Sequence, residues 1–188
     1  DLTRAKHAMC IFEQIYFSRP DSIVNGELAY ETRKRLGAEV YREHPVDADI
    51  VVGIPDSSTP HAVGLAAAAK IPYTEAIIRN RYVGRTFIQP DQHSRDQGVR
   101  TKFNPMRGVI EGKKLLVVDD SIVRSTTIIR VVKMLRKAGA KEVHVRVASP
   151  PIISTCHFGV DMATLGELIA ANKTVEEIRD YIGADSLA

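Results

Sequence analysis

Two adjacent aspartates, Asp119 and Asp120, stand where a run of apolar residues ends, and a short loop rich in hydroxyl groups follows them. Two like charges side by side at the end of a buried strand repel each other, so a bound partner is expected to offset that cost. Carboxylates accept hydrogen bonds from a vicinal diol and bind Mg²⁺ directly or through water. The pair therefore predicts a site for a diol, a metal ion, or both.

The loop after the aspartates carries the groups that hold a phosphate. Ser121, Ser125, Thr126 and Thr127 supply hydroxyls, and the loop leads into the N-terminus of a predicted helix, where backbone N–H groups bind anions. No G-x-x-x-x-G-K motif is present, so a nucleoside triphosphate held through its β and γ phosphates is not indicated. A phosphate, a diol and a metal ion within a few residues describe a ribose 5-phosphate.

A simpler interpretation is that Asp120 caps a turn and Asp119 is solvated, and an isolated Asp-Asp pair would favour it. The segment 79–107 changes the balance, because it holds seven basic residues against two acidic ones. Alone, this segment would be a solvated basic loop. Together with the hydroxyl-rich loop, its positive field favours an anion site.

The elements that must position these residues alternate between strand and helix. Consecutive apolar residues predict strands buried on both faces, and a 3.6-residue stripe predicts helices. Strands are predicted at 48–55, 72–80, 113–120 and 141–149, and helices at 60–70 and 126–138. This order predicts a mostly parallel sheet with ligands beyond the C-terminal ends of its strands.

Other segments complete the expected fold. Residues 141–149 alternate Val with polar residues, which predicts a strand with one less covered face, near an edge. Further helices are predicted at 26–43, 164–171 and 174–182, the last two each opening with a capping box. Residues 81–107 predict a lid or a disordered segment. The six histidines show no ligand spacing and are expected on the surface or in the lid.

The bulk composition narrows the class of protein. A chain of 188 residues suffices for one domain with a core. No run of about 18 apolar residues predicts a membrane helix, and the N-terminus has no signal-peptide layout. Two distant cysteines favour a reducing compartment, so a cytoplasmic location is expected. The net charge of +3 does not by itself indicate nucleic-acid binding.

Several stretches resemble a known family. "VVDDSIVRSTT" resembles the phosphoribosyl pyrophosphate (PRPP) motif of type I phosphoribosyltransferases, which displace pyrophosphate from C1 of the ribose with a nitrogen nucleophile. Other stretches resemble more specifically the phosphoribosyltransferase domain of the glutamine PRPP amidotransferases. These are "CIFEQIYFSRPDS" (10–22), "GIPDSS" (53–58), "RNRYVGRTFIQP" (79–90), "GVRTKFNP" (98–105), "SPPI" (149–152) and "CHFGVD" (156–161).

The resemblance implies a type I phosphoribosyltransferase fold: a mostly parallel α/β sheet flanked by helices, with a flexible lid and small helical additions at both ends. It implies that the acids bind the ribose hydroxyls and that the loop after them wraps the 5-phosphate. The implied PRPP-binding residues are Asp119, Asp120, Ser121, Ile122, Val123, Arg124, Ser125, Thr126 and Thr127. The implied Mg²⁺ ligands are Ser57, Asp119 and Asp120.

The resemblance also places a pyrophosphate site and a lid. Asp56, Ser57 and Ser58 are expected near the pyrophosphate, although the same residues also suit a turn that leads into a helix. The lid, from Arg81 to about Lys102, would close over PRPP and exclude water from the reacting carbon. The lid residues expected to matter most are Arg81, Tyr82, Gly84, Arg85 and Thr86.

One position departs from the family pattern. The family usually has glycine where this chain has Ser125. If the backbone there has a positive φ, a serine costs about 1 kcal/mol or more relative to glycine.

The resemblance implies Mg²⁺-dependent transfer of phosphoribosyl from PRPP to ammonia, giving 5-phosphoribosylamine and pyrophosphate, the first step of purine synthesis. In the family the ammonia comes from glutamine in a separate N-terminal glutaminase domain. Residues 1–188 are therefore expected to be one phosphoribosyltransferase domain, a fragment without that domain and without a C-terminal tail. Purine nucleotides would inhibit, and the assembly would be a homo-oligomer, with no nucleic-acid or membrane partner.

Cys10 and Cys156 align with ligands of a 4Fe–4S cluster in part of the family, and lone cysteines are more often buried and inert. Such a cluster needs four thiolates, so the fragment is not expected to hold one although a full-length enzyme could.

Two other functions stay open at the level of sequence. A type I phosphoribosyltransferase that uses a nucleobase would need a base pocket, and no segment is identified that provides one. A regulator that binds PRPP or nucleotides without catalysis would normally add a DNA-binding segment, for which no pattern is found.

Overall fold

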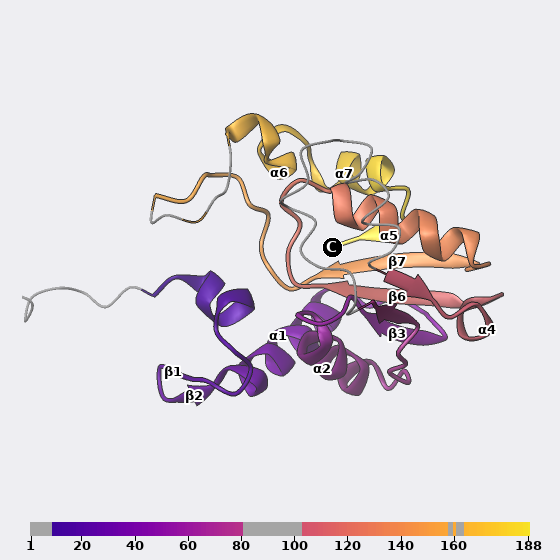
Figure 1. Ribbon diagram of the computed structural model, residues 1–188, viewed down its shortest axis with the longest axis horizontal. Helices are drawn as coiled ribbons and strands as arrows, with labels where there is room; N and C mark the ends of the chain where they lie inside the picture. The colour runs from indigo at the N-terminus through magenta and orange to yellow at the C-terminus, as the bar shows by residue number, and fades with distance from the viewer. Residues whose placement is uncertain (1–8, 81–102, 158–159, 161–163) are drawn as a thin grey trace, which may run out of the picture.

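The computed structural model describes residues 9–80, 103–157, 160 and 164–188. Four strands form a parallel sheet in the order β3-β6-β7-β8 (Figure 1). Their bounds are β3 Ile50–Gly53, β6 Lys114–Asp119, β7 Glu142–Val147 and β8 Ser186–Leu187. The predicted parallel sheet is therefore confirmed, and β6, which ends at the first of the two aspartates, lies inside it.

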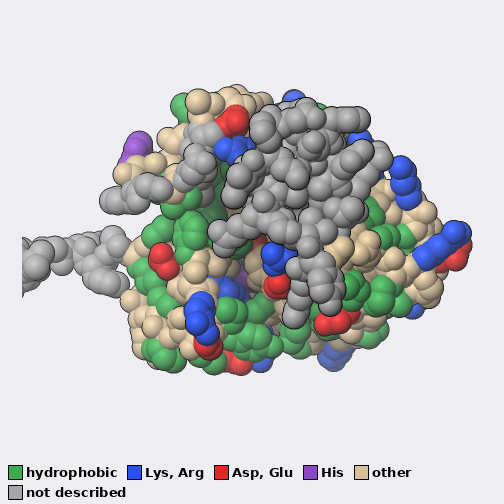
Figure 2. All heavy atoms as spheres, viewed as in Figure 1, with side chains coloured by type: hydrophobic (Ala, Val, Ile, Leu, Met, Phe, Trp, Pro, Cys, Tyr) green, Lys and Arg blue, Asp and Glu red, His purple; other side chains and the backbone are tan. Residues whose placement is uncertain are grey.

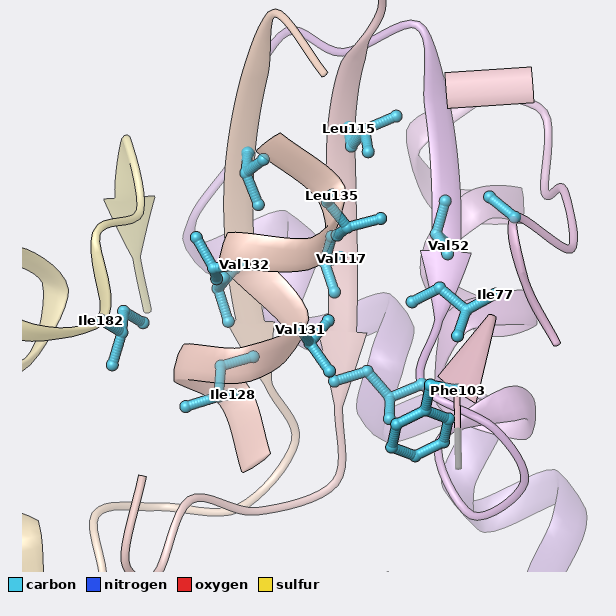
Figure 3. Packing of buried hydrophobic residues seen from close by; sticks show 14 of the residues in the cluster. Val52, Ile77, Phe103, Leu115, Val117, Ile128, Val131, Val132, Leu135 and Ile182 are labelled. Atoms are coloured by element: carbon cyan, nitrogen blue, oxygen red, sulfur yellow. The ribbon is translucent and has the colours of Figure 1, made fainter. Parts of the chain in front are cut away.

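Alternation along the strands divides the core into two layers. Val52, Leu115 and Val117 pack against α5 (Thr126–Lys137), through residues that include Val131 and Leu135 (Figure 3). The intervening residues pack on the other face against α2 (Thr59–Ala69); they are Val51, Leu116 and Val118. Each fully buried Val or Leu contributes roughly 1.5–3 kcal/mol. Both faces of β6 are thus covered, as its uninterrupted apolar sequence predicts.

Helix α1 (Ala29–Glu43) packs directly on α2, on the side of the sheet opposite α5, α6 (Ile169–Asn172) and α7 (Val175–Ile182) (Figure 1). Two glycines allow the close approach of α1 and α2. A Cβ atom on Gly37 would lie 1.9 Å from the carbonyl oxygen of His61, and one on Gly64 would lie 1.9 Å from that of Lys34. The two helices therefore meet backbone to backbone, which no larger residue would permit.

The N-terminal region holds a π-helical turn, Glu13–Phe17, and a short antiparallel pair, β1 Ile23–Val24 and β2 Glu27–Leu28. The helix predicted at 26–43 is confirmed as α1. On the face in Figure 2, acidic and basic side chains lie next to one another in several places, as expected from ion pairs such as Arg35 with Glu27 and Arg107 with Glu111.

The strand predicted at 72–80 is shorter than expected and only partly joins the main sheet. Tyr73 forms a parallel bridge with Val51, whereas β4 (Ile77–Arg79) pairs antiparallel with β5 (Phe103–Pro105) in a separate two-stranded sheet. At the end of the segment 81–107, predicted as a lid or a disordered segment, β5 is regular structure, and the short helix α4 (Arg107–Ile110) begins at its last residue. Residues 81–102 lie outside the described part of the chain.

The prediction that β7 has one less covered face is wrong, whereas its expected place near an edge is confirmed. β8 occupies the edge, and the polar residues His144 and Arg146 of β7 are only 7% and 4% exposed. Arg146 donates from Nε to the carbonyl of His44 at 2.9 Å, and the His144 ring contacts Ser186 Oγ at 2.9 Å and Glu142 at 3.0 Å. Specific hydrogen bonds replace water here, which an alternating pattern alone cannot reveal.

Of the remaining local predictions, one is confirmed and two are wrong. The capping box of Thr174 with Glu177 opens α7, as predicted. Thr164 instead precedes a short 3₁₀ helix, Leu165–Glu167, and the Thr164 side chain makes no capping hydrogen bond. His61, expected on the surface, is fully buried in α2. In the described part of the chain, no helix is both long enough and apolar enough to cross a membrane.

The contact between α1 and α2 generates a prediction. Gly37→Ala should lower the free energy of unfolding by about 1–3 kcal/mol, because the added methyl group must push two backbones apart. Gly108→Ala is the matched control, since a Cβ there meets no atom within 4 Å. Chemical denaturation monitored by circular dichroism measures both variants, and equal stability of the two would contradict the close contact.

Candidate functional site

The predicted site residues that follow β3 and β6 meet at the C-terminal edge of the parallel sheet. Three backbone hydrogen bonds join the ends of neighbouring strands there. Ile54 N–H donates to the carbonyl of Val118 at 2.9 Å, and on the other side Ala148 and Ser149 donate to the carbonyls of Asp119 and Asp120 at 3.0 and 2.9 Å. The loops after β3, β6 and β7 are thereby fixed relative to one another, so the two acids are held on a rigid base.

The two acids are buried and hydrogen-bonded. Asp119 and Asp120 are 8% and 5% exposed. Asp119 Oδ1 accepts from Ser58 Oγ at 3.0 Å and from the backbone N–H of Asp120 at 2.9 Å. Asp120 Oδ1 accepts from Ser121 Oγ at 2.7 Å. These bonds use Oδ1 of each carboxylate, and they hold both side chains at the edge where a ligand of the sheet would bind.

Burial, and to a smaller extent the neighbouring charge of Asp120, raise the pKa of Asp119 to about 7. The hydrogen bonds from Ser58 and from the Asp120 backbone act in the opposite direction. Ionising Asp119 beside Asp120 is therefore costly. A bound cation or a hydrogen-bonding diol would recover part of that cost.

The loop after the acids has a positive φ at Ser125, the condition under which a serine there was expected to be strained. Ser125 has φ 60° and ψ −10°, in the left-handed region. Its hydroxyl donates to the carbonyl of Arg124 at 2.5 Å instead of capping α5. Helix α5 starts at Thr126, and its positive N-terminal end faces this loop. An ion pair of 3.5 Å between Arg124 and Glu167 ties the loop to the 3₁₀ turn.

Two cavities border this loop. One, of about 390 Å³, lies between the start of α5 and the segment that leads into α7, and its lining includes Arg124, Ser125, Thr126 and Lys173. The other is an apolar cavity of about 70 Å³ beside Ile122 and the end of β7. Both cavities border Ile169, and neither is lined by Asp119 or Asp120.

The loop after β3 brings a second set of predicted residues to the same edge. Ser58 is fully buried and reaches Asp119, whereas Ser57, the predicted metal ligand, is partly exposed. Asp56 pairs with Arg79 at 2.7 Å, with both side chains about half exposed. The Pro55–Asp56 peptide bond is cis. The predicted lid residues lie outside the described part of the chain; they are Arg81, Tyr82, Gly84, Arg85 and Thr86.

The donor set suits a magnesium ion that shares its ligands with a substrate. Among the described residues, no three His, Cys, Asp or Glu side chains gather around a common point. Two buried carboxylates remain, and Mg²⁺ is typically bound by one or two carboxylates together with water and substrate phosphates. The acid pair therefore fits such an ion but would not enclose it.

The cysteines do not fit an iron–sulfur cluster by themselves. Cys10 is exposed, Cys156 is partly buried, and neither is in a disulfide. A 4Fe–4S cluster needs four thiolates, and the chain contains two cysteines.

Three buried polar residues take positions that the sequence did not indicate. Ser58, expected near the pyrophosphate, also donates a hydrogen bond to Asp119. His61 is fully buried, and burial, then the charge of Arg33, lowers its pKa to about 4, so it is neutral. Arg33 is 2% exposed. A signal for Arg33 exists in the sequence, because it shares an i, i+4, i+8 stripe with Ala29 and Gly37, which are both buried.

Comparison with known proteins identifies the family. The phosphoribosyl transferase domain family matches residues 21–149, which include both loops and the three strands that carry the site. The chain belongs to this family.

This phosphoribosyl transferase domain is similar over nearly its whole length to larger proteins. It is 54% identical over 184 residues to the amidophosphoribosyltransferase of Synechocystis sp., covering 98% of this chain and 37% of the relative. It is 56% identical over 180 residues to that of Methanocaldococcus jannaschii, covering 96% of this chain and 38% of the relative. The chain thus spans little more than a third of the length of these relatives.

Solved structures agree with the sequence matches. The glutamine PRPP amidotransferase from B. subtilis, complexed with ADP and GMP, is 56% identical, with a TM-score of 0.86 over 95% of this chain and 39% of that chain. An orotate phosphoribosyltransferase from Francisella tularensis shares 18% identity with a TM-score of 0.50 over 87% of this chain and 67% of that chain, which supports the fold alone. The type I phosphoribosyltransferase fold expected from the sequence is confirmed.

The raised pKa of Asp119 predicts a pH-dependent stability effect. In wild type, Asp119 ionises near pH 4 when unfolded but only near pH 7 when folded, so its contribution is favourable below about pH 4 and is lost as the pH rises through 7. Asp119→Asn removes this titration. The variant should be more stable than wild type by roughly 1–2 kcal/mol at pH 8, and the gap should close near pH 4.

Urea unfolding at the two pH values, without magnesium, measures the gap for Asp119→Asn. Asp180→Asn, at an exposed acid of α7, is the control and should show no such change with pH. A gap for Asp119→Asn that is equal at pH 4 and pH 8 would show that the buried charge is not its cause.

The left-handed backbone at Ser125 predicts an order of stability. Ser125→Gly relieves about 1 kcal/mol of steric cost, partly offset by the extra freedom of glycine in the unfolded chain, for a net gain of about 0.5 kcal/mol. Ser125→Ala keeps the steric cost and loses the hydroxyl bond to Arg124, for a loss of about 1 kcal/mol. Thermal denaturation should rank glycine above serine and serine above alanine. Any other order would contradict the positive φ.

Proposed function

We propose that this chain transfers the phosphoribosyl group of PRPP to ammonia and releases pyrophosphate and 5-phosphoribosylamine. One observation carries the proposal: a buried acid pair lies immediately before a hydroxyl-rich loop that leads into the N-terminus of α5, at the C-terminal edge of a parallel sheet, in a chain similar to amidophosphoribosyltransferases over almost its full length. This reaction would be the first step of purine synthesis.

Asp119 and Asp120 would accept hydrogen bonds from the two ribose hydroxyls. The geometry suits this role, because Ser58 and Ser121 each orient one oxygen of a carboxylate. Backbone hydrogen bonds from the loop after β7 hold both acids in place. The 5-phosphate would bind to the loop from Ser121 to Thr127, where the N-terminal end of α5 favours a negative charge. Neither acid needs to act as a nucleophile, since positioning and electrostatics can supply the rate.

Magnesium would be held by Asp119 and Asp120, with Ser57 as a further ligand and with oxygens of PRPP completing the shell. When bound, the ion would neutralise charge on the departing pyrophosphate. The hydroxyl of Ser58 would help to orient Asp119 for this role, because it donates a hydrogen bond to the Asp119 carboxylate.

The pyrophosphate would lie near the loop of Asp56, Ser57 and Ser58. Asp56 is an acid in a place proposed for an anion, and its ion pair with Arg79 supplies the compensating positive charge. The lid residues from Arg81 to about Lys102 would close over the substrate, exclude water and stabilise the charge of the leaving group.

The partners follow from the relatives. Ammonia would come from glutamine through a glutaminase domain outside residues 1–188. Purine nucleotides would inhibit, a proposal supported by the B. subtilis relative complexed with ADP and GMP. We also propose a homo-oligomer, and two of the four ligands of a 4Fe–4S cluster at Cys10 and Cys156 in a longer chain. A cytoplasmic location is proposed as well, although two relatives from Arabidopsis thaliana are chloroplastic.

The proposal predicts that the chain consumes PRPP with Mg²⁺ and ammonium at mildly alkaline pH, with pyrophosphate release as the measurement. The double variant Asp119→Asn, Asp120→Asn should lose PRPP turnover by at least a hundredfold, because it removes both charged acceptors. Asp180→Asn is the matched control, since that acid is exposed on α7.

Unchanged turnover in the double variant would refute the site. Tight binding of PRPP without turnover by the wild-type chain, measured by calorimetry, would instead favour a PRPP-binding regulator. Turnover with a nucleobase but not with ammonium would favour a salvage transferase.

A further inference from the structure

Asn25 and Gly26 form an exposed turn with a left-handed backbone. They are the two residues between β1 and β2, and Val24 pairs with Glu27 directly across the turn. Their φ angles are 53° and 80°, which is typical of the type I′ hairpin turn that an Asn-Gly pair favours. Both residues are exposed, and a Cβ atom on Gly26 would meet nothing within 4 Å. The backbone at Gly26 is therefore accessible.

An asparagine that precedes glycine can lose its side-chain amide without an enzyme. The backbone nitrogen of Gly26 gives up its proton and attacks Cγ of Asn25, the bond from Cγ to Nδ2 breaks, and the amide nitrogen leaves as ammonia. A succinimide ring remains. One water molecule opens the ring to aspartate or to isoaspartate, in which the chain continues through the side chain. Glycine favours the attack, because no Cβ atom crowds its nitrogen.

The side-chain amide of Asn25 is weakly held. Its Nδ2 donates to Sδ of Met9 at 2.7 Å, and a thioether sulfur is a weak acceptor. Asn172, also exposed, is held more firmly, because its Nδ2 donates to the carbonyls of Leu165 and Leu168 at 3.1 and 3.0 Å. The bonds around the amide therefore favour its loss at Asn25 over its loss at Asn172.

The residue that follows each asparagine acts in the same direction. The chain has four asparagines, and Asn25 is the one that precedes glycine. Asn172 precedes a lysine, whose Cβ atom hinders the attack. Asn104 is exposed but precedes a proline, whose nitrogen carries no hydrogen and cannot form the ring. The chain thus contains its own comparison sites.

The turn must open before the nitrogen of Gly26 can reach Cγ of Asn25, since a hairpin turn fixes the backbone of both residues. β1 and β2 have two residues each and form a sheet of their own, separate from the parallel sheet (Figure 1). Ile23 of β1 is 67% exposed, so the pair buries little apolar surface there. A two-stranded hairpin is marginally stable, and its opening costs little free energy.

The reaction would change both the charge and the length of the turn. Glu27 forms an ion pair with Arg35 of α1 and accepts a hydrogen bond from Thr32 Oγ1 at 3.2 Å. A carboxylate at residue 25 places a like charge two residues from Glu27. Isoaspartate also adds one carbon atom to the chain between the strands, which does not fit a turn of two residues. The modified hairpin would therefore lose its pairing.

We propose that Asn25 is a site of spontaneous deamidation: the exposed and weakly paired turn lets the backbone nitrogen of Gly26 displace ammonia from the side chain, and water opens the ring to isoaspartate and aspartate. The isoaspartate is a substrate for enzymes that methylate isoaspartyl carboxylates. This site is separate from the acid pair and does not depend on the proposed function.

Incubation of the folded chain at mildly alkaline pH tests the proposal. Peptide mapping by mass spectrometry follows the replacement of an amide by a carboxylic acid, and an isoaspartyl methyltransferase with S-adenosylmethionine detects isoaspartate. The acid should form at residue 25 at least about tenfold faster than at Asn172, and none should form at Asn104. Asn25→Gly is the control variant, because a Gly-Gly pair keeps the type I′ turn, and it should abolish the methylation.

The same measurement in urea shows whether the fold protects the turn. The rate at residue 25 in the folded chain should lie within about tenfold of the rate in the unfolded chain, because the hairpin opens readily. A folded chain that reacts more than about tenfold more slowly would overturn the proposal. A rate at Asn25 no higher than the rate at Asn172 would overturn it as well, and so would methylation that persists in Asn25→Gly.

Discussion

The structure depends on keeping two carboxylates together where water is scarce. Asp119 is the last residue of a strand that is covered on both faces, Asp120 follows it, and each is less than a tenth exposed. Isolated like charges in such a place would separate or become protonated. The surroundings hold the pair in place: Ala148 and Ser149 donate to the carbonyls of Asp119 and Asp120, and the hydroxyl of Ser58 donates to the Asp119 carboxylate.

The parallel sheet serves to bring the residues of the candidate site together. Its C-terminal edge collects loops from strands that are distant in the sequence, and each loop contributes one kind of group. The loop after β3 contributes a hydroxyl, the loop after β6 the acids and the start of α5, and the loop after β7 backbone donors. The apolar layers on either side make the edge stiff, so small groups can hold a precise geometry.

Much of this could be predicted from the sequence, for identifiable reasons. The runs that became β3 and β6 are apolar at consecutive positions, and the stripe of α5 is regular, so burial alone determined those elements. The acid pair was predicted because its charges conflict with its place at the end of such a run. The glycine-like conformation of Ser125 could be stated only as a condition, because φ at one residue depends on the whole loop.

What escaped prediction depends on partners that are distant in the chain. Ser57 and Ser58 are equivalent in sequence, and only the path of the loop after β3 decides which one turns toward Asp119. His144 and Arg146 look like exposed residues until Ser186 and the end of α1 are placed beside them. Arg33 lies on the same stripe of α1 as two small buried residues, which could have indicated its burial. Charged residues on helices are usually solvated, however, so the sequence alone favours the wrong interpretation.

The two-residue strand β8 has a consequence for the order of assembly. It covers the edge of β7, and about forty residues of chain separate the two strands. Until Ser186 and Leu187 pair, the backbone groups along that side of β7 stay open to any other extended chain. Parallel strands that are far apart in the sequence pair slowly. Self-association of the open β7 edge is therefore a risk during synthesis, and the pairing of the two-residue strand β8 removes that risk.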